Sequence, residues 1–335
     1  MKKHSGLSLV ELMISMALSL ILMMGILQIF TANKAAFEIS RDINYMQDNA
    51  QVALALLAES IRLADHWGGV APELVKFGKT ALKVPSGKCS RPWIFRSEEG
   101  LRGYEGANDI NGVNALPSAC VDAQDYQKNS DLLALRYADS HIIISDQQVD
   151  NARFAKHNIV RTSAGIAAYV FSGANYEAAF TYIPKNIAAY NMLYATHLFF
   201  LRPCSNGQSA HENVCKDEAP TLMRMTLSGD RFIQQPMVAG IEQMQFDYGV
   251  DSNNDHQIDQ YLAAHLVERW QQVLSVRISL IVRGDKKDAS INEPRKEYLM
   301  RGDFASVGSG FIAEDSLKFF RRRLYQREVM LRNRL

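Results

Sequence analysis

Glu11 is a single carboxylate inside a long apolar stretch near the start of the chain. It is the only charged residue between Leu7 and Phe30, and no proline interrupts that stretch. About 20 apolar residues are enough for a helix to span the core of a bilayer. A carboxylate at that depth costs on the order of 3 kcal/mol, so its presence indicates a function. Glu11 is therefore the first candidate functional residue.

The basic residues around this stretch predict its orientation. Lys2 and Lys3 precede it, and Lys34 is the first basic residue to follow it. The positive-inside rule then leaves the N-terminus in the cytoplasm and places the remaining ~300 residues outside. A cleaved secretory signal peptide would have a shorter apolar run and a small-residue cleavage site, and Ile29–Lys34 offers none. We expect a single-pass membrane protein with its globular part outside the cytoplasm.

The residues around Glu11 resemble a known leader. Gly6-Leu7-Ser8-Leu9-Val10-Glu11-Leu12 is similar to the start of type IV prepilins and type II secretion pseudopilins, although Leu7 stands where the family usually has Phe or Met. The resemblance implies that residues 1–6 are a leader removed by a prepilin peptidase and that Leu7 is then methylated. It also implies that Glu11, the fifth mature residue, is neutralised by the α-amine of a neighbouring subunit and so sets the axial register of the packed helices.

The apolar pattern continues beyond the membrane. Residues 31–66 contain no proline and no glycine. Apolar residues recur there at steps of three and four, which predicts one face of a helix; they are Met46, Ala50, Ala53, Leu54, Leu57, Ile61 and Ala64. We expect one long helix with a transmembrane half over residues 7–30 and an amphipathic half over 31–66. A glycine cap at Gly68 and Gly69 should end it.

Residues 67–335 predict a β-rich head. Alternating or apolar runs indicate short strands at Leu132–Tyr137, His141–Ser145, His197–Arg202, Leu222–Leu227, Ile241–Tyr248 and Val273–Arg283. Strands and helices do not alternate, so we expect an antiparallel sheet and an α+β, type IV pilin-like fold. The 37 basic residues balance 36 acidic ones, which argues against a globally basic nucleic-acid binder. No enzyme motif is complete, and we do not expect an enzyme.

Four cysteines lie on the side of the membrane that we expect to be oxidising. Pairing between sequence neighbours is the simplest arrangement, joining Cys89 to Cys120 and Cys204 to Cys215. Four cysteines allow three connectivities, and the sequence does not choose among them. Zinc binding is the alternative, but no C-x-x-C pair is present.

A short acidic loop is a candidate calcium site. Oxygen-bearing side chains occur at alternate positions, as at the start of an EF-hand loop; they are Asp251, Asn253, Asp255, Gln257 and Asp259. His256 replaces the usual glycine, and Leu262 replaces the bidentate glutamate. The alternative is a solvated hairpin turn. Calcium is the only cofactor that the sequence suggests.

The C-terminus is basic and resembles a particular pilin type. Six arginines and one acid lie between Arg321 and Arg334. Apolar residues alternate with them, so we expect an edge or penultimate strand with a charged outer face. The ending Leu331-Arg332-Asn333 resembles those of PilW-type minor pilins and of the J-type pseudopilin. With the large head, it favours the PilW type.

This resemblance implies a role in type IV pilus assembly. The expected partners are the prepilin peptidase, the major pilin and other minor pilins, the inner-membrane assembly platform and a PilY-type tip adhesin. The protein would prime the filament and support adhesion, twitching motility or DNA uptake. The near alternative is a J-type pseudopilin of type II secretion. A more distant one is a membrane-tethered periplasmic enzyme or a DNA receptor, and direct nucleic-acid contact is not expected.

Overall fold

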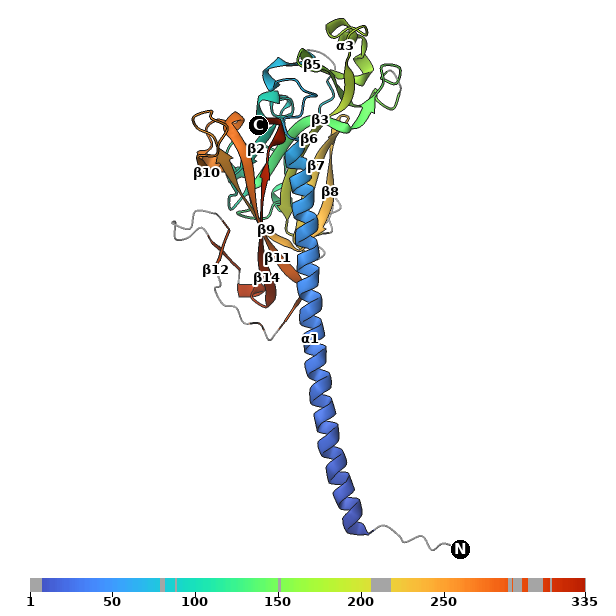
Figure 1. The fold of residues 1–335 in the computed structure, drawn as a ribbon, viewed down its shortest axis with the longest axis vertical. Helices are drawn as coiled ribbons and strands as arrows, with labels where there is room; N and C mark the ends of the chain where they lie inside the picture. Colours follow the sequence, from blue (N-terminus) through green and yellow to red (C-terminus); the bar gives the residue numbers. More distant parts are fainter. Residues whose placement is uncertain are drawn as a thin grey trace, which may run out of the picture.

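The computed structural model describes residues 8–78, 82–87, 89–149, 152–205, 218–288, 291, 297–300, 310–313 and 315–334. One long helix, α1 (Leu9–Leu63), projects from a β-rich head, and its N-terminal end lies far from that head (Figure 1). Two short helices, α2 (Arg91–Ile94) and α3 (Glu177–Tyr182), belong to the head. The architecture confirms the expected long helix on a large β-sheet head.

Local signals explain where α1 begins and ends. Ser8 caps its first turn, and the helix continues for 55 residues without a proline. It ends at Leu63, and Asp65 takes a left-handed conformation with φ of 59°. Gly68 and Gly69 also have positive φ, but they form the turn beyond the helix rather than its cap. The predicted end was therefore a few residues too late.

The larger sheet contains eight strands among the described residues. Its main path runs β1-β5-β4-β6-β3-β2, while β7 pairs with β6 and β8 with β7. The strands are β1 (Val75–Phe77), β2 (Leu101–Tyr104), β3 (Leu132–Ile144), β4 (Asn158–Ser163), β5 (Ala167–Ser172), β6 (Tyr190–Arg202), β7 (Thr221–Ser228) and β8 (Arg231–Ala239). All described pairs in it are antiparallel except β1 with β5. The expectation of an antiparallel sheet is confirmed with that one exception.

The smaller sheet has four antiparallel strands in the order β10-β9-β11-β14. They are β9 (Ile241–Val250), β10 (Gln260–Ala263), β11 (Val273–Lys287) and β14 (Phe320–Met330). A separate hairpin joins β12 (Glu297–Leu299) to β13 (Gly310–Ile312). β14 lies at the edge of the sheet, which agrees with the basic edge strand expected for the C-terminus.

The second half of α1 lies between the two sheets. Figure 1 shows β8 on one side of the helix and β11 with β14 on the other. The helix residues Met46, Leu57 and Ile61 share one core with Phe199 of the larger sheet and Ile278 of the smaller one. The opposite face of the larger sheet is covered by the segment that follows α1, through residues such as Trp67 and Trp93. The head is therefore built around the C-terminal half of the helix.

Candidate assembly site on the exposed helix and its anchorage in the head

Glu11 closes the first turn of α1 in a capping box. Its Oε2 accepts a hydrogen bond from the backbone N–H of Ser8 at 3.0 Å, and the Ser8 hydroxyl accepts one from the N–H of Val10 at 3.3 Å. This arrangement satisfies N–H groups that have no partner within the helix. Glu11 is thus held at the extreme N-terminal end of the helix. Gly6 and Leu7, the predicted cleavage and methylation residues, lie outside the described residues.

The first half of α1 contacts nothing else in the described part of the chain. Its large apolar side chains from Leu9 to Phe30 are each between 52% and 74% exposed. By length and composition it is the one described helix that could cross a membrane, with a mean hydropathy of 2.3 in its most apolar window. A continuous apolar surface of this size marks a site that lipid or other proteins must cover. The helix therefore has the surface of a membrane anchor or of a subunit packed among other helices.

The hydroxyl side chains of Ser15, Ser19 and Thr31 are satisfied by the helix itself. The hydroxyl of Ser15 donates to the carbonyl of Glu11 at 2.9 Å, and that of Ser19 donates to the carbonyl of Ser15 at 2.7 Å. The hydroxyl of Thr31 bonds in the same way to Leu27 at 3.0 Å. In an apolar medium an unpaired hydroxyl would cost free energy, and these bonds avoid that cost. Glu11 is then the one side chain of this half that brings a carboxylate into the apolar surface.

The C-terminal end of the chain anchors the C-terminal end of α1. Asn333 donates its side-chain amide to the carbonyls of Arg62, at 3.1 Å, and Ala64, at 2.9 Å. These carbonyls have no partner in the following turn of the helix, so Asn333 acts as a helix cap from a distant part of the chain. Leu331 beside it is fully buried. The ending that resembled minor pilins has this structural role.

A buried ion pair strengthens that anchorage. The guanidinium of Arg334 pairs with the carboxylate of Asp65, and only 8% and 2% of the two side chains are exposed. Arg334 also donates to the carbonyl of Val273 at 2.9 Å, which links the helix end to the smaller sheet. We call Asp65, Asn333 and Arg334 the helix-end lock. These three residues were not predicted individually from the sequence, in which the basic C-terminus was the signal for the helix-end lock.

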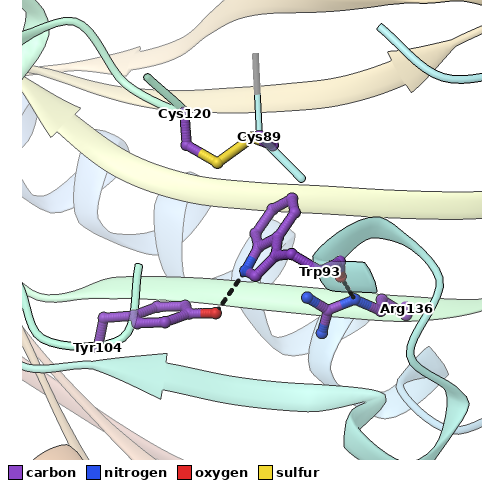
Figure 2. Close-up of a disulfide and its surroundings, with 5 residues drawn as sticks. All are labelled: Cys89, Trp93, Tyr104, Cys120 and Arg136. Carbon is purple, nitrogen blue, oxygen red and sulfur yellow. Dashed lines mark hydrogen bonds between the residues drawn. A yellow bond between two sulfur atoms is a disulfide. The ribbon is translucent and has the colours of Figure 1, made fainter. Parts of the chain in front are cut away.

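Cys89 and Cys120 form a disulfide in the segment that covers the larger sheet (Figure 2). Beside it, the indole N–H of Trp93 donates to the hydroxyl of Tyr104 at 2.6 Å, and the Trp93 carbonyl accepts from Nε of the buried Arg136 at 2.8 Å. The bridge therefore constrains a segment whose polar groups are paired with the sheet below it. Cys204 is also disulfide-bonded, while its predicted partner Cys215 lies outside the described residues.

Removing the Cys89–Cys120 bridge should destabilise the head. The bond closes a loop with a sequence separation of 31 residues, so the double variant Cys89→Ala/Cys120→Ala should lose about 3–4 kcal/mol of unfolding free energy, mainly because the unfolded chain gains freedom. Urea denaturation followed by tryptophan fluorescence measures it. The reduced wild-type protein should unfold at an equal or lower urea concentration than the variant, because reduction also opens the disulfide of Cys204. An unchanged midpoint in the variant would contradict this expectation.

Asp131 joins the two sheets through backbone contacts. One carboxylate oxygen accepts from the N–H of Gly106 at 2.8 Å, after β2, and the other accepts from the N–H of Phe246 at 2.9 Å, in β9. The side chain is fully buried. Burial raises the pKa of Asp131 from 3.8 to about 7, because the two donated hydrogen bonds lower it by less and the nearby carboxylate of Asp247 raises it further.

The stability supplied by Asp131 should fall as the pH rises. The folded state holds this proton more tightly than the unfolded state, so the contribution is complete below about pH 4 and is lost as the pH passes through about 7. The loss is up to about 4 kcal/mol. Relative to Asp131→Asn, the wild-type protein should lose unfolding free energy between pH 4 and 7. Asp48→Asn, at an exposed position, should follow the wild type, whereas parallel curves for Asp131→Asn and wild type would contradict the assignment.

The predicted calcium loop connects β9 to β10 and is built around Asp251. Its Oδ1 accepts from the N–H of Asn254 at 2.6 Å, and its Oδ2 accepts from the N–H of His256 at 2.8 Å. Asp259 accepts from the N–H of Ser252 at 2.8 Å. These contacts hold the turn through its own backbone. Within the described residues no group of three or more His, Cys, Asp or Glu side chains is arranged to hold a metal ion.

Calcium binding at this loop stays a proposal with a direct test. Calorimetric titration of the full chain with calcium chloride should give heat in the millimolar range if Asp251, Asn253, Asp255, Gln257 and Asp259 open towards a cation. The variant Asp255→Ala should abolish that heat while leaving Asp251 to hold the turn. Identical traces for both proteins would refute the site.

The structure separates the predicted site residues into distinct places. Glu11 lies at the free end of α1, while the Cys89–Cys120 bridge and the 251–259 loop lie in the head. They do not form one pocket. The feature that could act chemically with a partner is the exposed helix with Glu11 near its start.

Comparison with known proteins gives a match at each end of the chain. Residues 1–27 match the family model described as the prokaryotic N-terminal methylation motif, and residues 199–333 match the one described as type IV pilus-assembly protein W, or PilW. A type IV-like pilin from Thermus thermophilus is structurally similar, with a TM-score of 0.29 and 9% identity, over 86% of this chain and 95% of that one. No curated protein matched in sequence.

The two sequence matches agree with the architecture described above. A helix with an apolar, exposed first half and a second half packed in a β-rich head, preceded by a methylation motif, defines a type IV pilin-like protein. Such proteins are structural subunits and not enzymes. Within that class, residues 199–333 match the PilW family model, which supports a minor pilin role, and the match spans β7, β8, β9, β11 and β14 and reaches Asn333.

Proposed function

We propose that this minor pilin primes type IV pilus assembly as part of a complex with other minor pilins. The observation that supports the proposal most directly is the uncovered apolar half of α1, which carries a single carboxylate at Glu11. Lipid covers such a surface before assembly, and the helices of other pilins cover it afterwards. The chain thus has a way to move from the membrane into a filament without changing its head.

The proposed division of the chain follows from this reading. Residues 1–6 are the leader, 7–30 the membrane half of the helix, 31–66 its amphipathic half, and 67–335 the head. A prepilin peptidase removes the leader after Gly6, and Leu7 becomes the methylated N-terminus. The N-terminus faces the cytoplasm and the head faces the periplasm until the subunit enters the pilus, where it reaches the cell surface.

The size of the head favours a position at the start or tip of the filament. It contains two sheets, a hairpin and a disulfide-bonded covering segment, and such a bulky unit fits a repeating lattice poorly. We propose that it sits beneath a PilY-type adhesin and contacts the major pilin below and the assembly platform during initiation. Adhesion, twitching motility and DNA uptake would follow from piliation rather than from chemistry in the head.

Deletion of the gene tests the proposal. Pilus counts by electron microscopy should fall by at least tenfold, and expression of the wild-type chain in trans should restore them. Normal piliation with lost protein secretion would favour the J-type pseudopilin instead. Normal piliation with loss of transformation alone would favour a DNA receptor.

A further inference from the structure

We propose that the β14 flank of the head docks against the exposed helix of a second copy of this chain. The docking residues on one copy are Arg323, Arg327 and Arg332, which we call the arginine row. Those on the other copy are Asp48 and Glu59, which we call the acidic flank. The inference rests on the proposed function only in that both copies share one membrane orientation, with their α1 helices parallel.

Three of the six C-terminal arginines are used inside the head, and the arginine row is not. Arg321 pairs with Asp288 at 2.8 Å, Arg322 pairs with Glu242, and Arg334 pairs with Asp65. Arg323, Arg327 and Arg332 are exposed, and within the described part of the chain none of them has a carboxylate partner. The internal structure therefore explains only half of this basic segment.

The register of β14 places Arg323 and Arg327 beside α1, and Arg332 follows two residues after the strand ends. Side chains alternate across a strand, so Arg323 and Arg327 lie on the same face as Tyr325 and Val329. Val329 belongs to the core that contains α1, and Tyr325 packs against it. Among the described residues β14 pairs with β11 on one edge only. The arginines thus stand at an open edge of the head, next to the helix.

The acidic flank lies on the exposed face of α1. Asp48 is exposed and has no partner in the described structure. The side chain of Glu59 is 63% exposed, and in the described structure the exposed imidazole of His141 lies 3.6 Å from its carboxylate. The two residues are 11 positions apart, which is about three helical turns, so they point the same way about 16 Å apart. Arg323 and Arg327 are about 13 Å apart along a strand, and their long side chains can accommodate the difference.

The two charged surfaces lie on opposite sides of α1 in one molecule. His141 of β3 places Glu59 toward the larger sheet, whereas β14 lies on the side of the smaller sheet (Figure 1). One copy therefore cannot satisfy both surfaces by itself. A second copy placed beside it, with its helix parallel, brings the arginine row of one molecule to the acidic flank of the next. This contact is heterologous, because it joins two different surfaces of the two copies.

Basic residues on an edge strand can also serve simply to prevent strand-to-strand aggregation. The two explanations differ in what they predict for the helix. Protection of the edge requires nothing of Asp48 or Glu59, whereas docking requires opposite charge at both surfaces. A charge-swap experiment separates them.

The experiment measures association between two differently tagged full-length copies in membranes, by energy transfer between fluorophores on the tags. Arg327→Glu and Glu59→Arg should each lower self-association by about tenfold. Mixing the Arg327→Glu copy with the Glu59→Arg copy should restore it, because both possible contacts between the two copies then join opposite charges, one as in the wild type and one with the charges reversed. Arg231→Glu, which reverses an exposed arginine on β8, serves as the matched control and should have no effect.

Failure of the mixed pair to regain association would overturn the inference, as would undiminished association in both single variants. The inference would also be overturned if the two single variants lost contact with a different pilin while their self-association persisted. The partner at this surface would then not be a second copy of the chain. The two proposals can fail separately. Normal piliation in the deletion strain, together with charge-swap rescue between the tagged copies, would refute the proposed function and leave the docking surface intact. Loss of piliation in the deletion strain, without any self-association of the tagged copies, would support the proposed function and overturn the docking inference.

Discussion

Replacing Glu11 with alanine should lower incorporation of this subunit into pili by about 100-fold while leaving leader removal intact. Under the proposed function the Glu11 carboxylate pairs with the α-ammonium of a neighbouring subunit. Its removal would leave that ammonium unpaired in an apolar surface, at a cost on the order of 3 kcal/mol, or about two powers of ten. Within the described residues the Glu11 side chain accepts a hydrogen bond from the backbone N–H of Ser8. Loss of that cap costs the helix about 1 kcal/mol, so the subunit still folds.

Two further variants separate charge from capping at this position. Glu11→Gln keeps a side-chain oxygen that can accept from Ser8, but it cannot pair with an ammonium group, so it should be as defective as alanine. Ser15→Ala removes a hydroxyl that bonds only within the helix and should assemble normally. The measurements are the amount of this protein in sheared pili and N-terminal sequencing of the membrane form. Full incorporation of the Glu11→Ala protein would exclude the register role.

Breaking the helix-end lock should have the largest effect on stability. Arg334→Ala leaves the Asp65 carboxylate buried and unpaired, and loss of one member of such a pair typically costs 3–5 kcal/mol. Burial raises the pKa of Asp65 even with Arg334 present, and the guanidinium opposes that rise. Without Arg334 the pKa rises further. The cost should therefore be greatest at neutral pH and should fall as the pH is lowered and Asp65 takes up a proton.

Urea denaturation of the full chain followed by fluorescence measures this effect, since Trp270 lies at the lock through its carbonyl. Arg332→Ala, two residues away and exposed, is the matched control and should change the unfolding free energy by less than about 0.5 kcal/mol. Combining Asp65→Asn with Arg334→Ala should cost less than the sum of the two single changes. Additive effects would mean that the two side chains do not act as a pair.

The sequence predicted the elements that depend on local pattern. The run from Leu9 to Leu63 has a helical stripe, a capping serine and no proline, and each of these signals acts within a few residues. Three strands of the smaller sheet, β9, β11 and β14, were also predicted, whereas β10 was not. Two predicted strands, at 132–137 and 141–145, proved to be the single strand β3 with a register shift between Asp139 and Ile143. β4, β5 and β8 were not predicted, and they alternate less clearly than the strands that were.

The sequence alone therefore determined the features that depend on residues close together in the chain. They are the charge pattern near Glu11, the leader and the apolar stripe of α1. Only the tertiary structure decided which arginines pair inside the head, where Asp131 lies, and that the chain's last residues cap its long helix. Asn333 is 271 residues from Arg62, and Asp131 is 115 from Phe246. Contacts over such separations arise from packing, which no short-range pattern records.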